Sequence, residues 1–441
     1  MKKWVLIFVI SLLSVTIAGA EETDPIATQN ASRRDTIRYG TDAELLALIG
    51  VLENEENTSL DADLIALLKN AGGVKFVDAV FAYLTKGKKE GGENRALQIL
   101  QNRDKEANSN IDSALQYLSS VKNKKASTAL REILETEDAR FSTAAARALG
   151  ACGNEEDADY LVKYGKERTL TDALTAEIIY SLGEIKSKRA TDFLTGILSN
   201  PDSKSSKKIG ALEALGKIAD QNSLEPILDS LRDLDANVRS YAVTALSSFS
   251  GNKTEKALIE AFRDSYYKVR IAAAKAAGER KLAEAIPYLK FRAERDEIVS
   301  VKEAALSALG SIGSGEALEI IFSLFSEKKT ADRLRITSAK AMLEKAPDKY
   351  ITAVIAAMEQ AKAEKKMLLY HGLAKIISMT KTPNLEEQTR RFLSSNDTID
   401  KMYGLDLTIL NRYEGVKELV RALEKGANTA LLRKIKLALG E

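Results

Sequence analysis

The sequence predicts an all-α protein, an α-α superhelix of about twelve helical hairpins, on three observations. A similar segment recurs roughly every 32 residues along much of the 441-residue chain. Within each recurrence, small and apolar residues fall at spacings that share one side of a helix. A single amphipathic pair of helices cannot bury both of its apolar faces, whereas stacked pairs can. We therefore expect a solenoid rather than a compact globule.

The recurrence emerges when seven segments are aligned on a common final residue, which we call the repeat end. The steps between successive repeat ends are 33, 33, 31, 31, 32 and 33 residues. Small or apolar residues stand nine, five, two and one residues before most repeat ends, as a buried helical stripe requires. The glycines among the repeat ends predict helix C-caps with a left-handed backbone. The seven repeat ends are Gly150, Gly183, Gly216, Ser247, Gly278, Gly310 and Leu343.

Another amphipathic stretch precedes each of these helices, as in residues 224–231, 257–263 and 317–325. Each repeat is therefore a first helix and a second helix, antiparallel and joined by a short turn. The pattern resembles HEAT repeats of the short variety, most specifically over residues 233–247 and 264–278. The resemblance implies a HEAT-like or armadillo-type solenoid whose second helices line a concave surface and bind other proteins.

Three repeat regions are predicted from the strength of the match. The clear repeats occupy residues 125–345. Divergent helical repeats precede them over residues 41–124, with a second helix near residues 111–119. Divergent repeats and a cap follow over residues 346–441. Their expected second helices are residues 367–377, 399–410 and 431–440.

The first twenty residues are predicted to be a secretory signal. A short Lys-rich start precedes an apolar run over residues 4–17, and small residues then precede Glu21. We therefore expect export to the periplasm or outside a bacterial cell, with no stable membrane insertion after cleavage. Residues 21–40 are polar, contain Pro25 and lack periodicity, so they are interpreted as a flexible polar leader.

Composition argues against several classes of function. One Cys and one His cannot form an internal disulfide or a multi-histidine metal site. Without residues 1–20 the chain has 63 basic and 63 acidic residues, which disfavours nucleic-acid binding. We interpret Cys152 as a small buried thiol and His371 as a packed or surface side chain. Metal, cofactor and catalytic residues are therefore all expected to be none, and acidic residues 155–159 lack the pattern of a calcium loop.

A charged column recurs in register through four repeats, with a base six residues after each acid. As a groove-lining ladder it would bind an anionic polymer or an acidic peptide. As a structural ladder, each Asp would lie in the turn, cap the second helix and pair with its own or a neighbouring repeat. Acids match bases one for one, so we favour the structural ladder, with an exposed rung contributing about 1 kcal/mol. The pairs are Asp202 with Lys208, Asp233 with Arg239, Asp264 with Arg270, and Asp296 with Lys302.

Partner-binding candidates lie on the second helices, three and seven residues before the repeat ends, where the buried stripe leaves the surface free. Among them Ile271 and Ile336 stand out, since an exposed isoleucine suggests a contact. Either could instead pack on the next repeat. The candidates are Arg147, Tyr180, Ile271, Lys275, Ile336 and Lys340.

The expected function is a non-enzymatic scaffold or adaptor for unidentified protein partners. Two alternatives come from other HEAT-like proteins: a bilin-lyase-like enzyme, and a nucleic-acid-binding solenoid like the HEAT-fold alkylbase glycosylases. Export opposes the first, and zero net charge opposes the second. An acidic segment between Arg38 and Lys69 and a basic C-terminal end also allow head-to-tail contact between copies.

Overall fold

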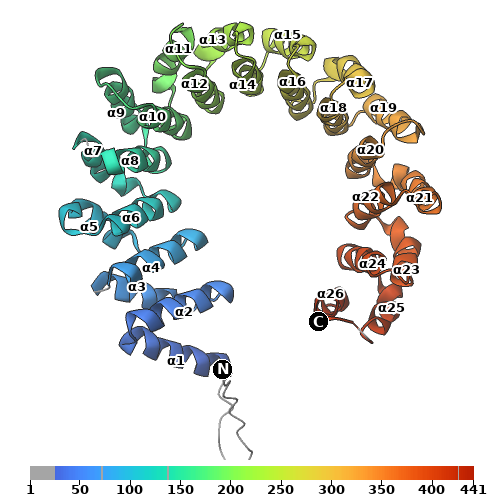
Figure 1. Ribbon diagram of the computed structural model, residues 1–441, viewed down its shortest axis with the longest axis horizontal. Helices are drawn as coiled ribbons and strands as arrows, with labels where there is room; N and C mark the ends of the chain where they lie inside the picture. Colours follow the sequence, from blue (N-terminus) through green and yellow to red (C-terminus); the bar gives the residue numbers. More distant parts are fainter. Residues whose placement is uncertain (1–24, 71–72, 137–138, 426) are drawn as a thin grey trace, which may run out of the picture. The chain divides into compact units, whose positions relative to one another are not determined.

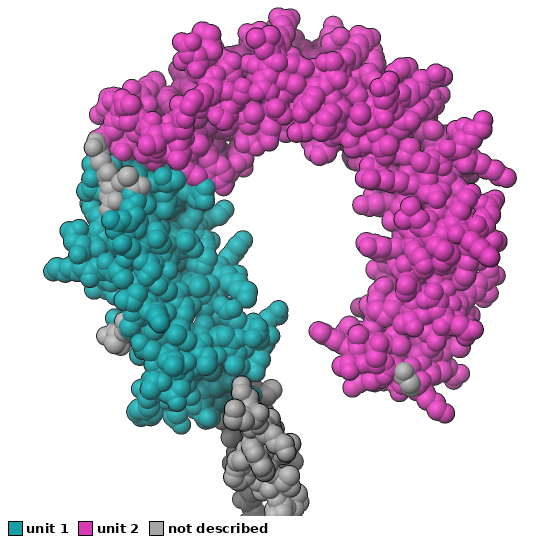
Figure 2. Space-filling view, in the orientation of Figure 1, with its two compact units in different colours: residues 1–157 teal, residues 158–441 magenta. Residues whose placement is uncertain are grey.

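The computed structural model describes residues 25–70, 73–136, 139–425 and 427–441, so the predicted signal at residues 1–20 lies outside them. The described residues form helices α1–α26 and contain no strand (Figure 1). The predicted all-α solenoid class is therefore confirmed. The chain divides into two compact units, residues 1–157 (unit 1) and residues 158–441 (unit 2) (Figure 2).

Unit 1 is a stack of helical pairs in which consecutive second helices, α2, α4, α6 and α8, pack on one another. Helix α9, Glu155–Glu167, crosses the boundary between the units. The helices before it are α1 Pro25–Tyr39, α2 Asp42–Asn54, α3 Asp61–Asn70, α4 Val74–Gly87, α5 Glu93–Gln101, α6 Asn108–Ser120, α7 Ser127–Glu135 and α8 Ala139–Cys152.

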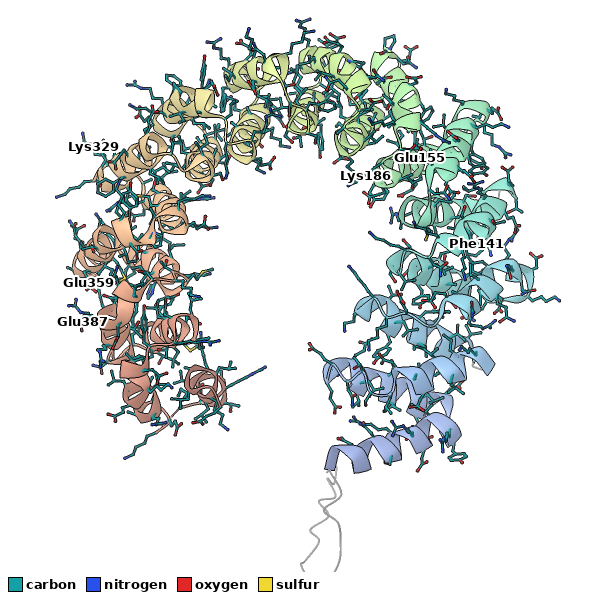
Figure 3. All side chains as sticks on the ribbon, turned by 180° about the vertical axis from the view of Figure 1, so that it is seen from behind. Phe141, Glu155, Lys186, Lys329, Glu359 and Glu387 are labelled. Atoms are coloured by element: carbon teal, nitrogen blue, oxygen red, sulfur yellow. The ribbon has the colours of Figure 1, made fainter. Side chains whose placement is uncertain are left out.

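Unit 2 has the same plan, with odd-numbered first helices in an outer row and even-numbered second helices in an inner, concave row (Figure 1). Glu359 and Glu387 mark the outer row (Figure 3). The outer helices are α11 Thr191–Ser199, α13 Leu224–Asp229, α15 Asn252–Glu260, α17 Ile286–Arg295, α19 Gly315–Ser326, α21 Pro347–Ala363, α23 Glu386–Leu393 and α25 Lys417–Ala422. The inner helices are α10 Asp172–Ile185, α12 Ser205–Ile218, α14 Ala236–Leu246, α16 Tyr267–Glu279, α18 Val299–Ile312, α20 Asp332–Lys345, α22 Met367–Ser378, α24 Thr398–Asn411 and α26 Thr429–Leu439.

The weak repeats are where the apolar pattern predicted them. The expected second helix at residues 111–119 is α6, and those at 367–377, 399–410 and 431–440 are α22, α24 and α26. About twelve hairpins were expected after residue 40. In the described residues the pairs run from α1/α2 to α25/α26, so one further pair begins within the segment interpreted as a leader.

The interpretation of residues 21–40 as a flexible leader is wrong for residues 25–39, which form α1. Among residues 29–39, whose side chains the structure describes, Ile37 is the buried hydrophobic residue. Two ion pairs hold it against the following helices: Arg33 to Glu55 at 2.8 Å, and Arg34 to Asp63 at 3.2 Å. Prediction from helical periodicity detects apolar stripes, and the polar sequence of this segment lacks a clear one, so the helix was missed.

The prediction that repeat-end glycines are helix C-caps is also wrong. They lie inside the second helices, and their role is to let consecutive second helices approach closely. A Cβ on Gly278 would come within 2.9 Å of the Ala308 Cα, and one on Gly310 within 2.7 Å of the Ala341 Cβ. Residues with a left-handed backbone conformation lie three positions after four of the repeat ends, where the second helices end. They are Lys186, Ala219, Lys281 and Gly313.

Candidate protein-binding surface

The exposed side of the second helices is where the repeat alignment predicted it. Every residue three positions before a repeat end is exposed, because its neighbours on both sides of the helix are committed to packing. The side chains alternate in chemistry along the chain rather than forming a single basic or acidic stripe. They are Arg147 in unit 1, and Tyr180, Glu213, Thr244, Lys275, Ser307 and Lys340 in unit 2.

Local contacts give this surface mixed charge. The Lys217 ammonium lies 4.9 Å from the centroid of the exposed Tyr180 ring and also pairs with Glu184 at 2.6 Å. Lys340 lies 3.7 Å from Glu344 on the same helix. Exposed ion pairs of this kind contribute little to stability. Breaking them would therefore cost little if these side chains contacted another protein.

The expectation that Ile271 and Ile336 are freely exposed is wrong, because both are half-buried. Ile336 packs on Gly372 of the next second helix, where a Cβ would meet the Ile336 Cδ1 at 2.2 Å. The absent side chain of Gly372 therefore makes the space that Ile336 fills. Positions seven residues before the repeat ends contribute to packing between repeats, as the alternative for these isoleucines anticipated.

The charged column forms a ladder between successive repeats of unit 2, in the turns before the second helices. Each base reaches the Asp of the following repeat. The rungs join Lys208 Nζ to Asp233 Oδ2, Arg239 Nε to Asp264 Oδ2, and Arg270 Nε to Asp296 Oδ2, each at 2.8 Å. Both arginines also donate from Nη1 to the backbone oxygen of their own repeat's Asp. Each rung thus ties two adjacent turns together.

The aspartates do not themselves cap the second helices, which corrects the predicted role. Asp233, Asp264 and Asp296 each lie two residues before the N-cap and accept its backbone N–H, as Asp264 does from Tyr266 at 2.7 Å. Burial alone would raise the pKa of Asp264, but hydrogen bonds from Arg239 and Tyr266 outweigh burial and hold that pKa below its ordinary value. The same balance, with Arg270 and Ile298 as donors, lowers the pKa of Asp296.

The ladder has definite ends. Asp202 is exposed and forms no ion pair with any residue that the structure describes. At the other end Lys302 donates to the backbone oxygen of Glu294 at 3.1 Å, because Lys329 stands where the next acid would be. Between these ends the rungs become more buried, until the Asp296 side chain is fully enclosed. The bases of the three rungs are committed to packing, so they offer no free basic groove.

The remaining polar candidates have structural partners. Cys152 is buried in unit 1, and burial raises its pKa to about 12 while its thiol faces the backbone oxygen of Leu118. In the acidic run, Asp157 pairs with Arg131 and Asp159 with Arg189. Over the described ranges, no three His, Cys, Asp or Glu side chains are grouped so that they could hold a metal ion. None of the helices described there is long and apolar enough to cross a membrane.

His371 lies half-buried on α22, and its ring centroid is 5.0 Å from that of Tyr370 and 6.3 Å from that of Tyr403. Its Nδ1 is buried without a hydrogen-bond partner among the described residues. The neighbouring Tyr370 hydroxyl donates to the buried Asp400 at 2.6 Å, and Lys362 reaches the same carboxylate at 3.0 Å. No pattern in the sequence indicates this three-residue network, because its members come from three different helices.

Sequence reasoning also missed six exposed apolar side chains on α22, α24 and the residue that follows α22: Met367, Leu368, Met379, Ile399, Ile409 and Leu410. The repeat alignment would have placed Leu368, Met379, Ile399 and Leu410 at equivalent positions if it had included two further repeat ends, Ser378 and Ile409. Each of these repeat ends is identified by buried residues nine, five, four and one positions before it. Those residues are Leu369, Leu373, Ala374 and Ile377 on α22, and Asp400, Gly404, Leu405 and Thr408 on α24.

Paired helices, glycine-mediated contacts between second helices and an Asp–Arg ladder together define a HEAT-type α-solenoid. The chain matches the family described as Spirochaete HEAT repeat protein over residues 37–438, and it belongs to that family. The predicted resemblance to HEAT repeats is therefore confirmed.

Other similarities are more distant. Deoxyhypusine hydroxylase-B of Oryza sativa subsp. japonica is 34% identical over 84 residues, which is 19% of this chain and only 28% of that protein. The complex of CpcE and CpcF of phycocyanin lyase from Nostoc sp. PCC7120 is 22% identical, covers 52% of this chain and 92% of its own, and has a TM-score of 0.35. Kap121p is 11% identical over 96% of this chain and 55% of its own, with a TM-score of 0.45. These likenesses concern the fold alone.

Proposed function

We propose that the protein is a non-enzymatic scaffold that binds other proteins on the inner row of unit 2. The observation that carries the proposal is the contrast between two sets of positions on the second helices. Packing positions repeat from helix to helix, whereas exposed positions such as Tyr180, Thr244 and Lys275 differ. A surface whose chemistry changes along a regular frame suits recognition of an extended partner.

Three features support a binding role rather than an enzymatic one. The one thiol is buried with a raised pKa, so it is a poor nucleophile. The ladder aspartates are held ionised by arginines, which suits structure better than proton transfer. No metal-holding group occurs in the described residues. We accordingly propose that no cofactor takes part and that neither bilin chemistry nor nucleic-acid binding is its role.

We also propose that the mature protein acts in the bacterial cell envelope, in the periplasm or outside the cell. Support comes from the sequence of residues 1–20, which has the charge, apolar run and small residues of a signal peptide. Amino-terminal sequencing of the secreted or periplasmic protein tests this directly. The expected first residue is Glu21, and an intact Met1 in the cytoplasm would refute export.

Site-specific photo-crosslinking in cells tests the scaffold. A photoreactive amino acid replaces Lys275 or Lys340 on the inner row, and Glu359 on the outer row serves as the matched control. The inner positions should each crosslink to the same one or two proteins, while Glu359 should not. Crosslinks at Glu359 alone, or crosslinks only within the chain, would refute binding on the inner row.

A further inference from the structure

The inner row of unit 2 changes from polar to apolar at α22 and α24. Ten residues before the repeat end, these helices carry Leu368 and Ile399, which are 72% and 49% exposed. One residue after the repeat end they carry Met379 and Leu410, which are 68% and 38% exposed. Met367 and Ile409 on the same helices are also exposed, at 43% and 37%, so Leu368, Met379, Ile399 and Leu410 are four of six large apolar side chains that stand in solvent there. We call these four residues the apolar frame.

The same positions in the six preceding second helices of unit 2 hold no large apolar residue. The apolar frame is therefore a local departure from the repeat and not a general property of the row. Ten residues before the repeat end stand Ala173, Ser206, Asn237, Lys268, Ser300 and Arg333. One residue after it stand Glu184, Lys217, Ser248, Glu279, Ser311 and Glu344.

Hydrogen bonds between α22 and α24 show that equivalent positions lie side by side. Tyr403 Oη donates to the backbone oxygen of His371 at 3.4 Å, and Asn411 Nδ2 donates to that of Thr380 at 3.2 Å. Leu368 therefore neighbours Ile399, and Met379 neighbours Leu410. Eleven residues separate the two ends of the frame on each helix, about 16 Å at 1.5 Å per residue. That length equals about three turns of a helix laid along the two helices.

Free positive charge lies along the middle of the frame and at its Met379–Leu410 end, whereas the exposed Asp397 lies near Ile399 at the other end. Lys375, Lys381 and Arg412 are exposed and pair with no acid among the described residues. The nearby acid Asp406 is already neutralised by Lys434 at 2.6 Å. A ligand for this surface must therefore offer apolar side chains and, at its edges, negative charge.

We propose that the apolar frame on α22 and α24 is the docking site for an amphipathic helix of a partner protein, with acidic residues flanking its apolar face. This inference rests on the proposed scaffold function and assigns its main contact to one place in the row. The partner helix would lay apolar residues spaced i, i+4, i+7 and i+11 over the frame. Its acidic flanks would meet Lys375, Lys381 and Arg412.

The test uses a labelled synthetic helical peptide of eighteen residues with leucines at that spacing and glutamates on both flanks. Fluorescence anisotropy measures its binding to the full-length exported protein. The test variant Met379→Ser/Leu410→Ser introduces the residue that α14 and α18 carry at this position. The matched control, Glu279→Ser/Glu344→Ser, changes the same position on α16 and α20. All four side chains are exposed, so circular dichroism should show both variants folded.

The acidic peptide should bind the wild-type protein and the control equally, and the test variant at least about tenfold more weakly, since apolar burial is lost. A peptide with lysines in place of the glutamates should also bind at least about tenfold more weakly. Equal binding to the test variant, equal binding of the lysine peptide, or no binding at all would overturn the proposal.

Two other occupants give separate results that would also overturn it. A second copy of the chain would appear as a concentration-dependent dimer in sedimentation, abolished in the Met379→Ser/Leu410→Ser variant. An anionic membrane would appear as co-sedimentation with phosphatidylglycerol vesicles that excludes the peptide. If Lys275 and Lys340 crosslink to a partner but the apolar frame does not bind the peptide, the proposed scaffold function is supported and this inference is refuted. If no inner-row position crosslinks in cells, the scaffold itself fails.

Discussion

Replacing Asp296 by Asn should destabilise unit 2 far more than removing an exposed acid. The Asp296 side chain is 0% exposed and accepts from Arg270 Nε and Nη2, both at 2.8 Å. It also accepts from the backbone N–H of Ile298 at 3.0 Å and from Arg292 Nη1 at 3.2 Å. Asn keeps the shape but removes the charge, so two guanidinium groups lose their counter-ion.

Removing one partner of a buried ion pair costs about 3–5 kcal/mol, because the other charge stays buried. Asn retains one oxygen that can accept, so we expect the lower end, about 3 kcal/mol. The matched control is Glu225→Gln, whose partner Lys253 lies at 2.7 Å with both side chains more than half exposed. An exposed pair of this kind contributes under about 1 kcal/mol. The figure of about 1 kcal/mol predicted from the sequence was for an exposed rung, so it does not apply to this buried one.

Urea unfolding followed by circular dichroism measures the difference in free energy of unfolding. Because stacked repeats can unfold in parts, hydrogen exchange in α16 and α18 should be followed as well. Asp296→Asn should lower protection in both helices, since its rung joins their turns. The reasoning is refuted if Asp296→Asn and Glu225→Gln cost the same.

Three further predictions use other features. The pKa values of Asp264 and Asp296 are lower in the folded state, so their stabilisation is complete above the unfolded pKa, about 4, and is lost as pH falls through the folded pKa. Acid unfolding of Asp296→Asn should accordingly be less steep than that of the wild-type protein. Gly278→Ala should cost about 1–3 kcal/mol by thermal unfolding, through overpacking. Gly196→Ala, a helical site with open space, should instead stabilise by roughly 0.4–1 kcal/mol. Cys152 should resist iodoacetamide at pH 8 until the protein is unfolded, as mass spectrometry would show.

The architecture was predictable because the sequence repeats the same physical constraint many times. The buried stripe of the second helices recurs through the aligned repeats. An accidental match of the apolar pattern in one helix therefore has little influence on the prediction. The ladder was predictable for the same reason, and its rungs connect neighbouring repeats as one of its two interpretations required. Its burial was not predictable, since that depends on how closely adjacent turns approach.

Single features without repetition were misjudged. The repeat-end glycines suit a left-handed C-cap and a close helix contact equally well in sequence, and only the three-dimensional spacing of Gly278 and Ala308 decides between them. For Ile336 the sequence left both solvent exposure and packing on the next repeat open, because nothing in it linked this residue to Gly372, which lies 36 residues away. Helix α1 was missed because its polar sequence lacks a clear apolar stripe, and its ion pairs through Arg33 and Arg34 leave no periodic pattern.

The same logic indicates where to look for function in a solenoid. Positions that pack must repeat, so their residues report on the fold and carry no information about a partner. Exposed positions have no such constraint, and a large apolar residue there is costly to keep in water unless it is covered. Leu368 and Met379 stand at positions where the preceding helices of unit 2 have no large apolar residue, and α24 repeats the departure beside them. The requirements of the fold do not account for the same departure at both ends of one face on two adjacent helices, and this is why we propose a shared ligand there.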